Sequence, residues 1–358
     1  MTTYLLAGGG TAGHVNPLLA VADGLRARDA DADVRVLGTA EGLESRLVPQ
    51  RGYELLVVDK VPFPRRPDRT AAVFPGRFRR AVAHVGEHIA RHGVDVIVGF
   101  GGYASAPAYV AARRAGIPFV VHEANARPGL ANRLGARRAA GVGVAFEGTP
   151  LPRARLVGMP LRREIEDLDR SALRGEGAAH FGLDPDPDRP TLLVFGGSLG
   201  ALRLNTAFAG SWREVLDAGW QLIHVTGDRS DLEDPGVPGY ALRRYVDRMD
   251  LAFAACDFIV SRSGAATVSE ISALGIPAVY VPYAVGNGEQ ALNASSAVAH
   301  GAAVLISDAE FTSDAVRGRI LPLLTDASER ASMAERAAEI GIRTGTENLI
   351  AMIDEVLA

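Results

Sequence analysis

Short apolar segments alternate with helical stretches along this 358-residue chain, and this alternation limits its fold more than any other feature. Between the segments, apolar residues recur at helical spacing, as in residues 18–28. The pattern is typical of parallel strands whose crossover helices cover both faces of a sheet. It predicts strands at 4–7, 34–37, 55–58, 94–98, 118–122 and 141–145, and again at 191–195, 221–225, 258–261, 278–281 and 303–306.

The pattern occurs twice, and the two halves join in a loop-rich stretch near residues 147–162. At roughly 100–200 residues per domain, the length also fits two domains. We therefore predict an α/β protein of two Rossmann-like, doubly wound parallel-sheet domains, residues 1–161 and 162–343, facing a cleft. The single cysteine, Cys256, excludes a disulfide scaffold and a zinc site built from several thiolates.

Glycine-rich segments follow four of the predicted strands. The first contains Gly8, Gly10 and Gly13, which formally satisfy the G-x-G-x-x-G pattern, and the others span residues 99–103, 196–201 and 263–267. Glycines at strand ends let backbone N–H groups approach a phosphate, so the four loops predict anionic ligands in both domains. Tight turns without a ligand are the simpler alternative. No acidic residue ends the second strand, which disfavours a nicotinamide cofactor.

Charge is distributed unevenly between the two halves. Residues 1–161 carry 21 Lys or Arg and 13 Asp or Glu, whereas residues 162–358 carry 17 and 29. A basic first domain indicates an anionic partner there: a phosphate ligand, nucleic acid or an anionic membrane. No nucleic-acid reader motif is recognisable, so we expect no nucleic-acid partner.

The most basic segment, residues 60–80, interleaves cations with aromatic residues. This mixture favours contact with an anionic membrane surface, and an exposed arginine-rich helix without that role is the alternative. The residues predicted for the membrane patch are Phe63, Phe74, Arg77, Phe78, Arg79 and Arg80.

Six motifs occur in the order found in one enzyme family. They are Gly9-Gly10-Thr11-Ala12-Gly13-His14-Val15, Gly101-Gly102-Tyr103, His122-Glu123-Ala124-Asn125, Gly196-Gly197-Ser198, Arg262-Ser263-Gly264-Ala265-Ala266-Thr267-Val268-Ser269-Glu270 and Asn287-Gly288-Glu289-Gln290. On these motifs the chain resembles, over essentially its whole length, the MurG family of peptidoglycan glycosyltransferases of GT-B fold. The Asn-Gly-Glu-Gln version is similar to that of actinobacterial members.

The resemblance implies an inverting hexosyltransferase that moves N-acetylglucosamine (GlcNAc) from UDP-GlcNAc to the 4-hydroxyl of the muramyl sugar of lipid I, giving lipid II. It places the donor mostly on the second domain and the lipid-linked acceptor on the first. It also implies a last helix, about residues 344–358, that returns to the first domain, and peripheral attachment at the cytoplasmic side of the cell membrane. We expect no cofactor and no metal site.

Carried over residue by residue, the resemblance implies a donor site centred on Glu270, whose two carboxylate oxygens suit the ribose hydroxyls. The start of the following helix would offer its N–H groups to the diphosphate, with simple helix capping by Ser or Thr as the alternative. The implied UDP-GlcNAc contacts are Thr11, Ala12, Gly13, Asn125, Arg162, Ser198, Val246, Ala265, Ala266, Thr267, Val268, Ser269, Glu270 and Gln290, and the acceptor contacts are Gly101, Gly102 and Tyr103.

Histidines carry two further hypotheses. His14 ends the first glycine loop and is the candidate catalytic residue, because an imidazole can take a proton from a hydroxyl near neutral pH. An electrostatic contact to a ligand phosphate is the rival role. His84, His88 and His92 share one helical spacing, and we expect them on the solvated side of their helix rather than at a metal.

Other functions remain compatible with these residues. Within the same fold they are another UDP-sugar transferase or a UDP-GlcNAc 2-epimerase. Outside it, the chain could be a non-catalytic nucleotide-sugar or lipid-binding protein, or a dinucleotide oxidoreductase.

Overall fold

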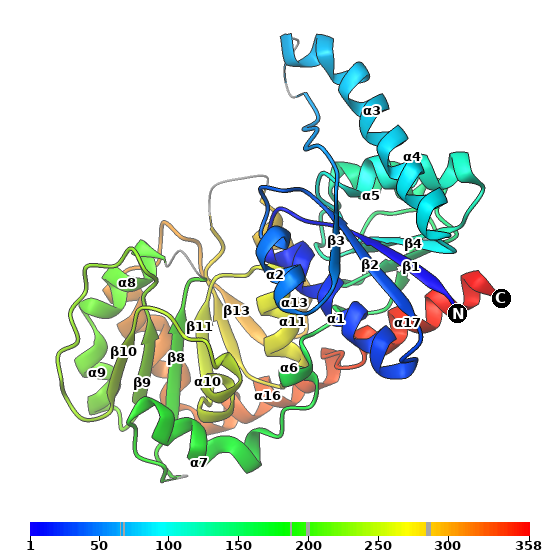
Figure 1. Ribbon diagram of the computed structural model, residues 1–358. Coiled ribbons are helices and arrows are strands. Elements are labelled where there is room, and N and C mark those ends of the chain that lie inside the picture. The colour runs from blue at the N-terminus through cyan, green and yellow to red at the C-terminus, as the bar shows by residue number, and fades with distance from the viewer. Residues whose placement is uncertain (65, 67–68, 187, 198–200, 284–287) are drawn as a thin grey trace. The chain divides into compact units, whose positions relative to one another are not determined.

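Two parallel α/β units make up the chain in the computed structural model, which describes residues 1–64, 66, 69–186, 188–197, 201–283 and 288–358. Unit 1 contains Met1–Arg162 and Thr344–Ala358, and unit 2 contains Arg163–Arg343. Figure 1 shows the elements of each unit. The first boundary lies one residue beyond the position expected from the sequence.

Unit 1 is built on a seven-stranded sheet in the order β3-β2-β1-β4-β5-β6-β7, in which every pair of neighbours is parallel. Its strands are β1 (Thr3–Ala7), β2 (Asp33–Gly38), β3 (Glu54–Val57), β4 (Val96–Gly99), β5 (Phe119–Glu123), β6 (Gly141–Val144) and β7 (Arg155–Leu156). Its helices are α1 (Ala12–Arg28), α2 (Glu44–Gln50), α3 (Arg69–His92), α4 (Ser105–Ala115), α5 (Leu130–Ala136) and α17 (Gly345–Leu357).

Unit 2 is built on a six-stranded parallel sheet in the order β10-β9-β8-β11-β12-β13. Its strands are β8 (Thr191–Phe195), β9 (Gln221–Val225), β10 (Tyr240–Arg243), β11 (Phe258–Ser261), β12 (Ala278–Tyr280) and β13 (Ala303–Leu305). Its helices are α6 (Arg163–Glu166), α7 (Arg170–Phe181), α8 (Leu202–Ala209), α9 (Trp212–Asp217), α10 (Met249–Ala255), α11 (Ala265–Ala273), α12 (Glu289–Asn293), α13 (Ser295–Ala299), α14 (Ser313–Ala315), the π-helix η1 (Val316–Ile320), α15 (Leu321–Thr325) and α16 (Ala327–Ile340).

Both sheets reverse their strand order at one point, between β1 and β4 in unit 1 and between β8 and β11 in unit 2. Two doubly wound parallel sheets confirm the predicted fold class. At such a switch point the crossover helices leave on opposite faces, which opens a crevice at the carboxyl ends of the two strands. The four glycine-rich loops follow these same four strands, so the topology itself places them where ligands bind.

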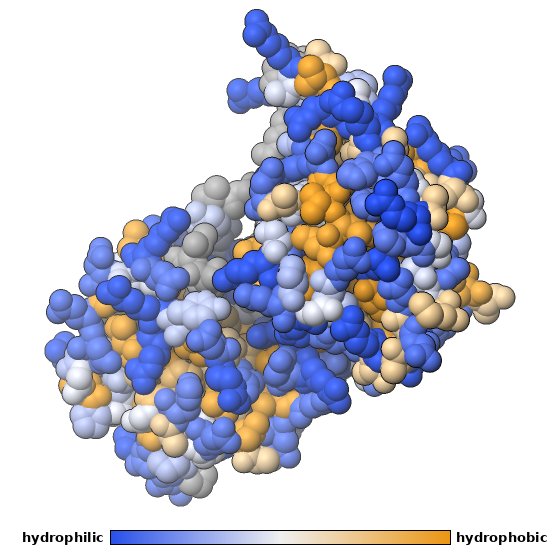
Figure 2. Space-filling view, viewed as in Figure 1, coloured by the Kyte–Doolittle hydropathy of each residue, from blue (hydrophilic) through white to orange (hydrophobic). Residues whose placement is uncertain are grey.

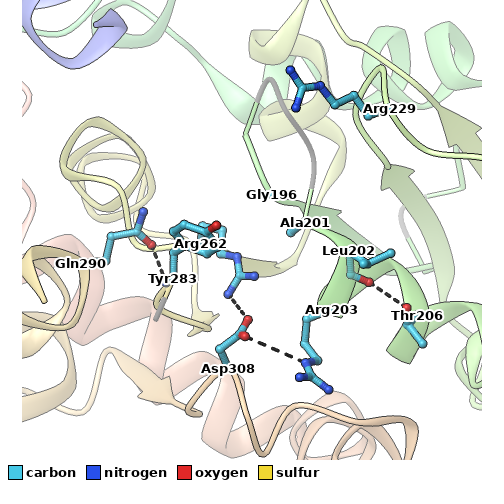
Figure 3. A pocket seen from close by; sticks show the side chains of 10 residues that line it. All are labelled: Gly196, Ala201, Leu202, Arg203, Thr206, Arg229, Arg262, Tyr283, Gln290 and Asp308. Carbon is cyan, nitrogen blue, oxygen red and sulfur yellow. Dashed lines mark hydrogen bonds and ion pairs between the residues drawn. The ribbon is translucent and has the colours of Figure 1, made fainter. Parts of the chain in front are cut away.

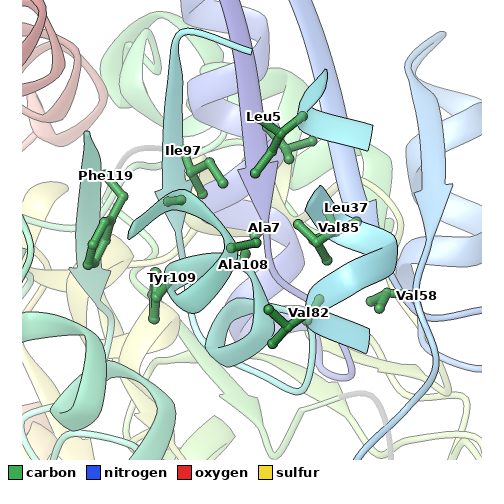
Figure 4. Close-up of a cluster of buried hydrophobic side chains, with 14 of the residues drawn as sticks. Leu5, Ala7, Leu37, Val58, Val82, Val85, Ile97, Ala108, Tyr109 and Phe119 are labelled. Atoms are coloured by element: carbon green, nitrogen blue, oxygen red, sulfur yellow. The ribbon is translucent and has the colours of Figure 1, made fainter. Parts of the chain in front are cut away.

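The core of unit 1 lies on both faces of its sheet because β1 is buried along its full length. Its side chains alternate in direction, as strand geometry requires. Leu5 and Ala7 pack with α3 and α4 on one face, and Tyr4 and Leu6 pack with α1 and α17 on the other. Figure 4 shows the first of these clusters.

The last helix, α17, packs on unit 1 although it follows the whole of unit 2 in the chain. Its buried residues Leu349, Met352 and Ile353 join the α1 face of the core. A Cβ on Gly345 would lie 2.1 Å from the carbonyl oxygen of Met159, so only glycine allows the helix to begin this close to the unit. Full burial of each large apolar side chain contributes about 1.5–3 kcal/mol to stability, and this burial stabilises the packing of α17 on unit 1.

Candidate active site

Two glycine loops of unit 1, the one between β1 and α1 and the one after β4, contain residues whose backbone conformation favours glycine. Gly9 and Gly10 have φ of 157° and 91°, and Gly102 in the loop after β4 has φ of 82°. A Cβ on Gly102 would lie 2.4 Å from the carbonyl oxygen of Gly9. The structure therefore brings the predicted acceptor loop into direct contact with the loop that ends in His14.

A buried carboxylate, Glu44, lies against this loop. Its Oε2 accepts the N–H of Gly10 at 2.8 Å, and its Oε1 accepts the N–H and the hydroxyl of Thr39 at 2.9 and 2.8 Å. Burial by itself raises the pKa of Glu44, but these hydrogen bonds outweigh it and hold the pKa below its ordinary value. Glu44 therefore places a negative charge where a dinucleotide enzyme would bind pyrophosphate.

The imidazole of His14 is oriented by the same loop. Its Nδ1 lies 3.1 Å from the carbonyl oxygen of Gly9 and 3.3 Å from the hydroxyl of Thr11. A carbonyl oxygen only accepts, so the neutral ring carries its proton on Nδ1 and keeps the lone pair of Nε2 available. A Cβ on Gly101 would lie 3.0 Å from Nε2, so glycine at that position leaves the lone pair accessible.

The loop after β5 holds Asn125 through a second buried carboxylate. Glu123, which is 2% exposed, accepts the N–H groups of Asn125 and Gly129, each at 2.9 Å. It also accepts the side-chain amide of Asn132 at 3.0 Å. These bonds fix the backbone that carries Asn125 at the carboxyl end of the sheet.

The remaining predicted residues of unit 1 lie at several points of its surface. Thr11 and Ala12 are exposed at the start of α1, and Gly13 is partly exposed there. Tyr103 is exposed after β4, and the ammonium of Lys60 lies 5.3 Å from the centre of its ring. Arg162, half-buried, ends the first segment of the unit.

In unit 2, the strand β11 leads through Gly264 into α11, which carries the largest group of predicted donor contacts. Gly264 is extended and has no side chain to cap the helix, and no acidic residue stands in its first turn. The N–H groups of Ala265, Ala266 and Thr267 therefore stand at a helix start that favours an anion. Glu270 follows three residues after Thr267, on the same side of the helix, and both are half-buried.

A cavity of about 730 Å³ opens at the carboxyl ends of the same sheet, shown in Figure 3. Its described lining consists of Gly196, Ala201, Leu202, Arg203, Thr206, Arg229, Arg262, Tyr283, Gln290 and Asp308. Three arginines against one aspartate make this wall positive, which suits a phosphorylated ligand. Gln290 is the one predicted contact within the described lining.

Among the described residues, the other predicted donor contacts of unit 2 are not part of this lining. Val246 is buried three residues beyond the end of β10, and the α11 residues follow β11 at the same edge of the sheet. Ser198 lies outside the described residues. The sequence did not single out Arg203, Arg229 and Asp308. Charged residues are numerous in this chain, which has 38 Lys and Arg, and only the fold shows which of them line the cavity.

The predicted membrane patch lies on and beside the N-terminal turns of α3, which project beyond the sheet of unit 1 in Figure 1. Phe63, Phe74 and Phe78 pack together with ring centres 5.4 to 6.3 Å apart, and each is half-buried. The nearby Val73 is 55% exposed. The predicted arginines of the patch, Arg77, Arg79 and Arg80, are exposed, and Figure 2 shows hydrophilic residues around a small hydrophobic area at this end of the helix.

The position expected for the three histidines of α3 is wrong for one of them. His88 is 8% exposed and packs toward the core, with its ring 4.7 Å from that of His84 and 6.1 Å from that of His92. Burial and the neighbouring histidines lower its pKa. The apolar face of α3 is wide enough to include this position.

The described residues offer neither a metal site nor a membrane-spanning helix. No group of three or more His, Cys, Asp or Glu side chains there is arranged to hold a metal ion. Among the described helices, none has both the length and the apolar composition that crossing a bilayer requires.

Comparison with known proteins relates the whole chain to one group of enzymes. Residues 4–144 match the glycosyltransferase family 28 N-terminal domain, and residues 191–349 match the corresponding C-terminal domain. A protein of Leifsonia xyli subsp. xyli, the UDP-N-acetylglucosamine–N-acetylmuramyl-(pentapeptide) pyrophosphoryl-undecaprenol N-acetylglucosamine transferase, is 60% identical over 99% of this chain and 98% of its own.

Further relatives agree with this result. The protein of the same name from Streptomyces avermitilis is 48% identical over 99% of this chain and 98% of its own length. The crystal structure of Acinetobacter baumannii MurG superposes with a TM-score of 0.82 at 26% identity, covering 99% of this chain and all of the other. The glycosyltransferase of kitacinnamycin has the same fold, with a TM-score of 0.69 at 19% identity.

Proposed function

The chain belongs to the family of the UDP-N-acetylglucosamine–N-acetylmuramyl-(pentapeptide) pyrophosphoryl-undecaprenol N-acetylglucosamine transferases, and we propose that it performs their reaction. It transfers GlcNAc from UDP-GlcNAc to the 4-hydroxyl of the muramyl sugar of lipid I, which gives lipid II, a precursor of peptidoglycan. The observation that carries this proposal is the 60% identity over nearly the full length of both chains.

UDP-GlcNAc binds mainly to unit 2 in this proposal. Glu270 accepts the ribose hydroxyls, and the first N–H groups of α11 bind the diphosphate at the positive end of the helix dipole. The amide of Gln290 binds a hydroxyl of the sugar. The positive cavity wall supports the assignment of the charged part of the donor to this unit.

His14 acts as the general base on the acceptor. As the hydroxyl oxygen attacks the anomeric carbon of GlcNAc, its proton moves to Nε2 of His14, while the bond from the anomeric carbon to the diphosphate breaks and its electrons leave with UDP. One displacement from the opposite face inverts the anomeric centre. The accessible Nε2 supports this role, because the Gly9 carbonyl already occupies Nδ1–H.

Lipid I is reached at the membrane surface through unit 1. The arginines at the start of α3 would lie among lipid phosphates, each contributing about 1 kcal/mol near an anionic surface. The exposed Val73 and the aromatic cluster beside it would enter the interface. In this proposal the enzyme works at the cytoplasmic face of the membrane, where it would meet the anionic lipid-linked acceptor.

One assay tests the reaction. Purified protein is incubated with labelled UDP-GlcNAc and a lipid I analogue, and the product is separated and tested for a β-linked disaccharide. Label in the lipid product supports the proposal. Label transferred equally from UDP-glucose, epimerisation of UDP-GlcNAc without transfer, or binding of NADH in its place would each contradict it.

A further inference from the structure

The buried guanidinium of Arg262 connects the ends of three neighbouring strands of unit 2. Arg262 follows β11 and is 8% exposed. Its Nη1 donates to the carbonyl oxygens of Val281 and Pro282, at 2.9 and 3.3 Å, just beyond β12. The same nitrogen lies 2.5 Å from Oδ1 of Asp308, which stands beyond β13. A buried cation needs such a counter-charge, because desolvation would otherwise destabilise it strongly.

The segment that Arg262 holds leads directly to Gln290. Tyr283 follows Pro282, its ring centre lies 5.4 Å from the guanidinium, and its N–H donates to Oε1 of Gln290 at 2.8 Å. A backbone N–H only donates, so the contact fixes which side of the amide faces Tyr283. The two N–H donors of Gln290 are therefore left for the cavity, whose wall includes this residue, as Figure 3 shows.

We infer that Asp308 is a positioning residue for the donor sugar: through Arg262 it holds segment 281–283, and through Tyr283 it fixes the amide of Gln290. The inference deepens the proposed function and rests on it. The carboxylate also lies 3.9 Å from Nε of Arg203, so it balances two guanidinium groups on the cavity wall. Without its charge, the two cations repel each other and Arg262 loses the anion that keeps it buried.

The first test compares two ligands that share uridine diphosphate, of which only one carries the sugar. Calorimetry measures UDP-GlcNAc and UDP with the wild type, with Asp308→Asn and with the control Asp314→Asn, whose carboxylate is 93% exposed and pairs with Arg317 at 3.0 Å. Asp308→Asn should lower the preference for UDP-GlcNAc over UDP about two- to tenfold, the range for one neutral hydrogen bond, because the change in wall charge acts on the diphosphate of both ligands. The control should change neither.

Two unexpected results would contradict two different claims, the positioning role of Asp308 and the proposed donor site. If Asp308→Asn weakens both ligands equally, or neither, while the wild type binds both, the positioning role is wrong and the proposed function stands. If the wild type binds UDP without any preference for UDP-GlcNAc, the proposed donor site is wrong and the inference falls with it.

A second variant tests the amide orientation without disturbing the ion pair. Gln290→Glu keeps an oxygen for the N–H of Tyr283 and removes both N–H donors. It should weaken UDP-GlcNAc as much as Gln290→Ala does, and wild-type affinity in this variant would overturn the inference. In the Gln290→Ala background, Asp308→Asn should not lower the preference for UDP-GlcNAc over UDP any further, whereas fully additive losses of this preference would show that the two residues act separately.

Discussion

At the switch points of the two sheets, groups of opposite charge lie beside the glycine loops of unit 1 and unit 2. In unit 1 the N–H of Gly10 already donates to the unit's own carboxylate, Glu44. In unit 2 the described cavity wall carries Arg203, Arg229 and Arg262 against Asp308. Because the strand order is the same, the difference arises in the residues that follow the strands and not in the architecture.

The difference in charge bears on the role proposed for each unit. A diphosphate is repelled by a buried carboxylate and attracted by arginines, so unit 2 is the better site for the charged part of UDP-GlcNAc. In unit 1 the loop that Glu44 holds also holds His14, whose Nε2 suits a neutral hydroxyl. This difference supports the proposal that the nucleotide sugar binds in unit 2 and the acceptor hydroxyl in unit 1.

The largest expected effect lies in unit 1, at His14. His14→Ala should lower kcat by about 10²–10⁴-fold, the usual contribution of a general base, and leave the affinity for UDP unchanged. Steady-state kinetics and calorimetry measure the two quantities. The matched control is His84→Ala, an exposed histidine of the same unit. A kcat within about threefold of the wild type would exclude the base, and a loss of UDP affinity instead would favour the phosphate contact.

The next largest effect, on vesicle binding, is expected at the predicted membrane patch. Replacing Arg77, Arg79 and Arg80 with glutamine should weaken binding to anionic vesicles by about 3 kcal/mol, roughly 100-fold, because each cation contributes about 1 kcal/mol. Binding should also fall with salt, which screens these charges within about 10 Å at 0.1 M. Co-sedimentation with vesicles measures both effects, and turnover on a soluble acceptor analogue should be unchanged.

The matching control removes the same charge from unit 2, at the exposed Arg213, Arg244 and Arg319. It should leave vesicle binding nearly unchanged. If both triple variants lose the same affinity, net charge and not the start of α3 determines membrane binding.

Variants of Glu270 test whether unit 2 binds the donor. Glu270→Ala should weaken UDP binding by about 1.5–3 kcal/mol, the range for hydrogen bonds to a charged group, and Glu270→Gln by less. Calorimetry with UDP measures the change, with the exposed Glu335→Ala of α16 as the control. Unchanged UDP affinity in Glu270→Ala would remove the ribose contact from this helix.

The smallest expected effect concerns the carboxylate of unit 1. Glu44→Gln should lower the free energy of unfolding by about 1–3 kcal/mol, because an amide has one acceptor oxygen and the carboxylate accepts bonds on both. Urea unfolding measures the loss. The control is Glu54→Gln, whose carboxylate is 57% exposed in a surface ion pair and contributes little. Equal losses in the two variants would contradict a special role for Glu44.

The same pair of variants predicts a pH dependence. The folded-state pKa of Glu44 lies below its ordinary value, so its ionised form stabilises the fold above that value, and this stability is lost as pH falls through the folded-state pKa. The difference between wild type and Glu44→Gln should therefore be largest near neutral pH and shrink below about pH 4. A constant difference from pH 7 to pH 3 would mean that Glu44 has the same pKa in the folded and unfolded states.

Several features were predictable because each depends on neighbours along the chain. Apolar runs such as Thr191–Phe195 are buried on both faces of a parallel sheet and so appear without alternation. Glycines such as Gly9 and Gly10 follow a strand directly, and their positive φ is a local requirement. The edge strands β7 and β10 were missed, because Arg155–Leu156 is two exposed residues and Tyr240–Arg243 ends in a charge.

By itself, the sequence determined the two doubly wound domains, the four glycine loops and the family. Strand burial, turn conformation and motif order each depend on residues that follow one another in the chain. Tertiary structure alone decided that Glu44 accepts from Gly10, that His88 is buried, and that Arg262 and Asp308 meet beside Tyr283. The physical reason is that these contacts join residues brought together by the crossover connections of the sheets. Their energies depend on burial and on the partner's charge, and local sequence contains neither.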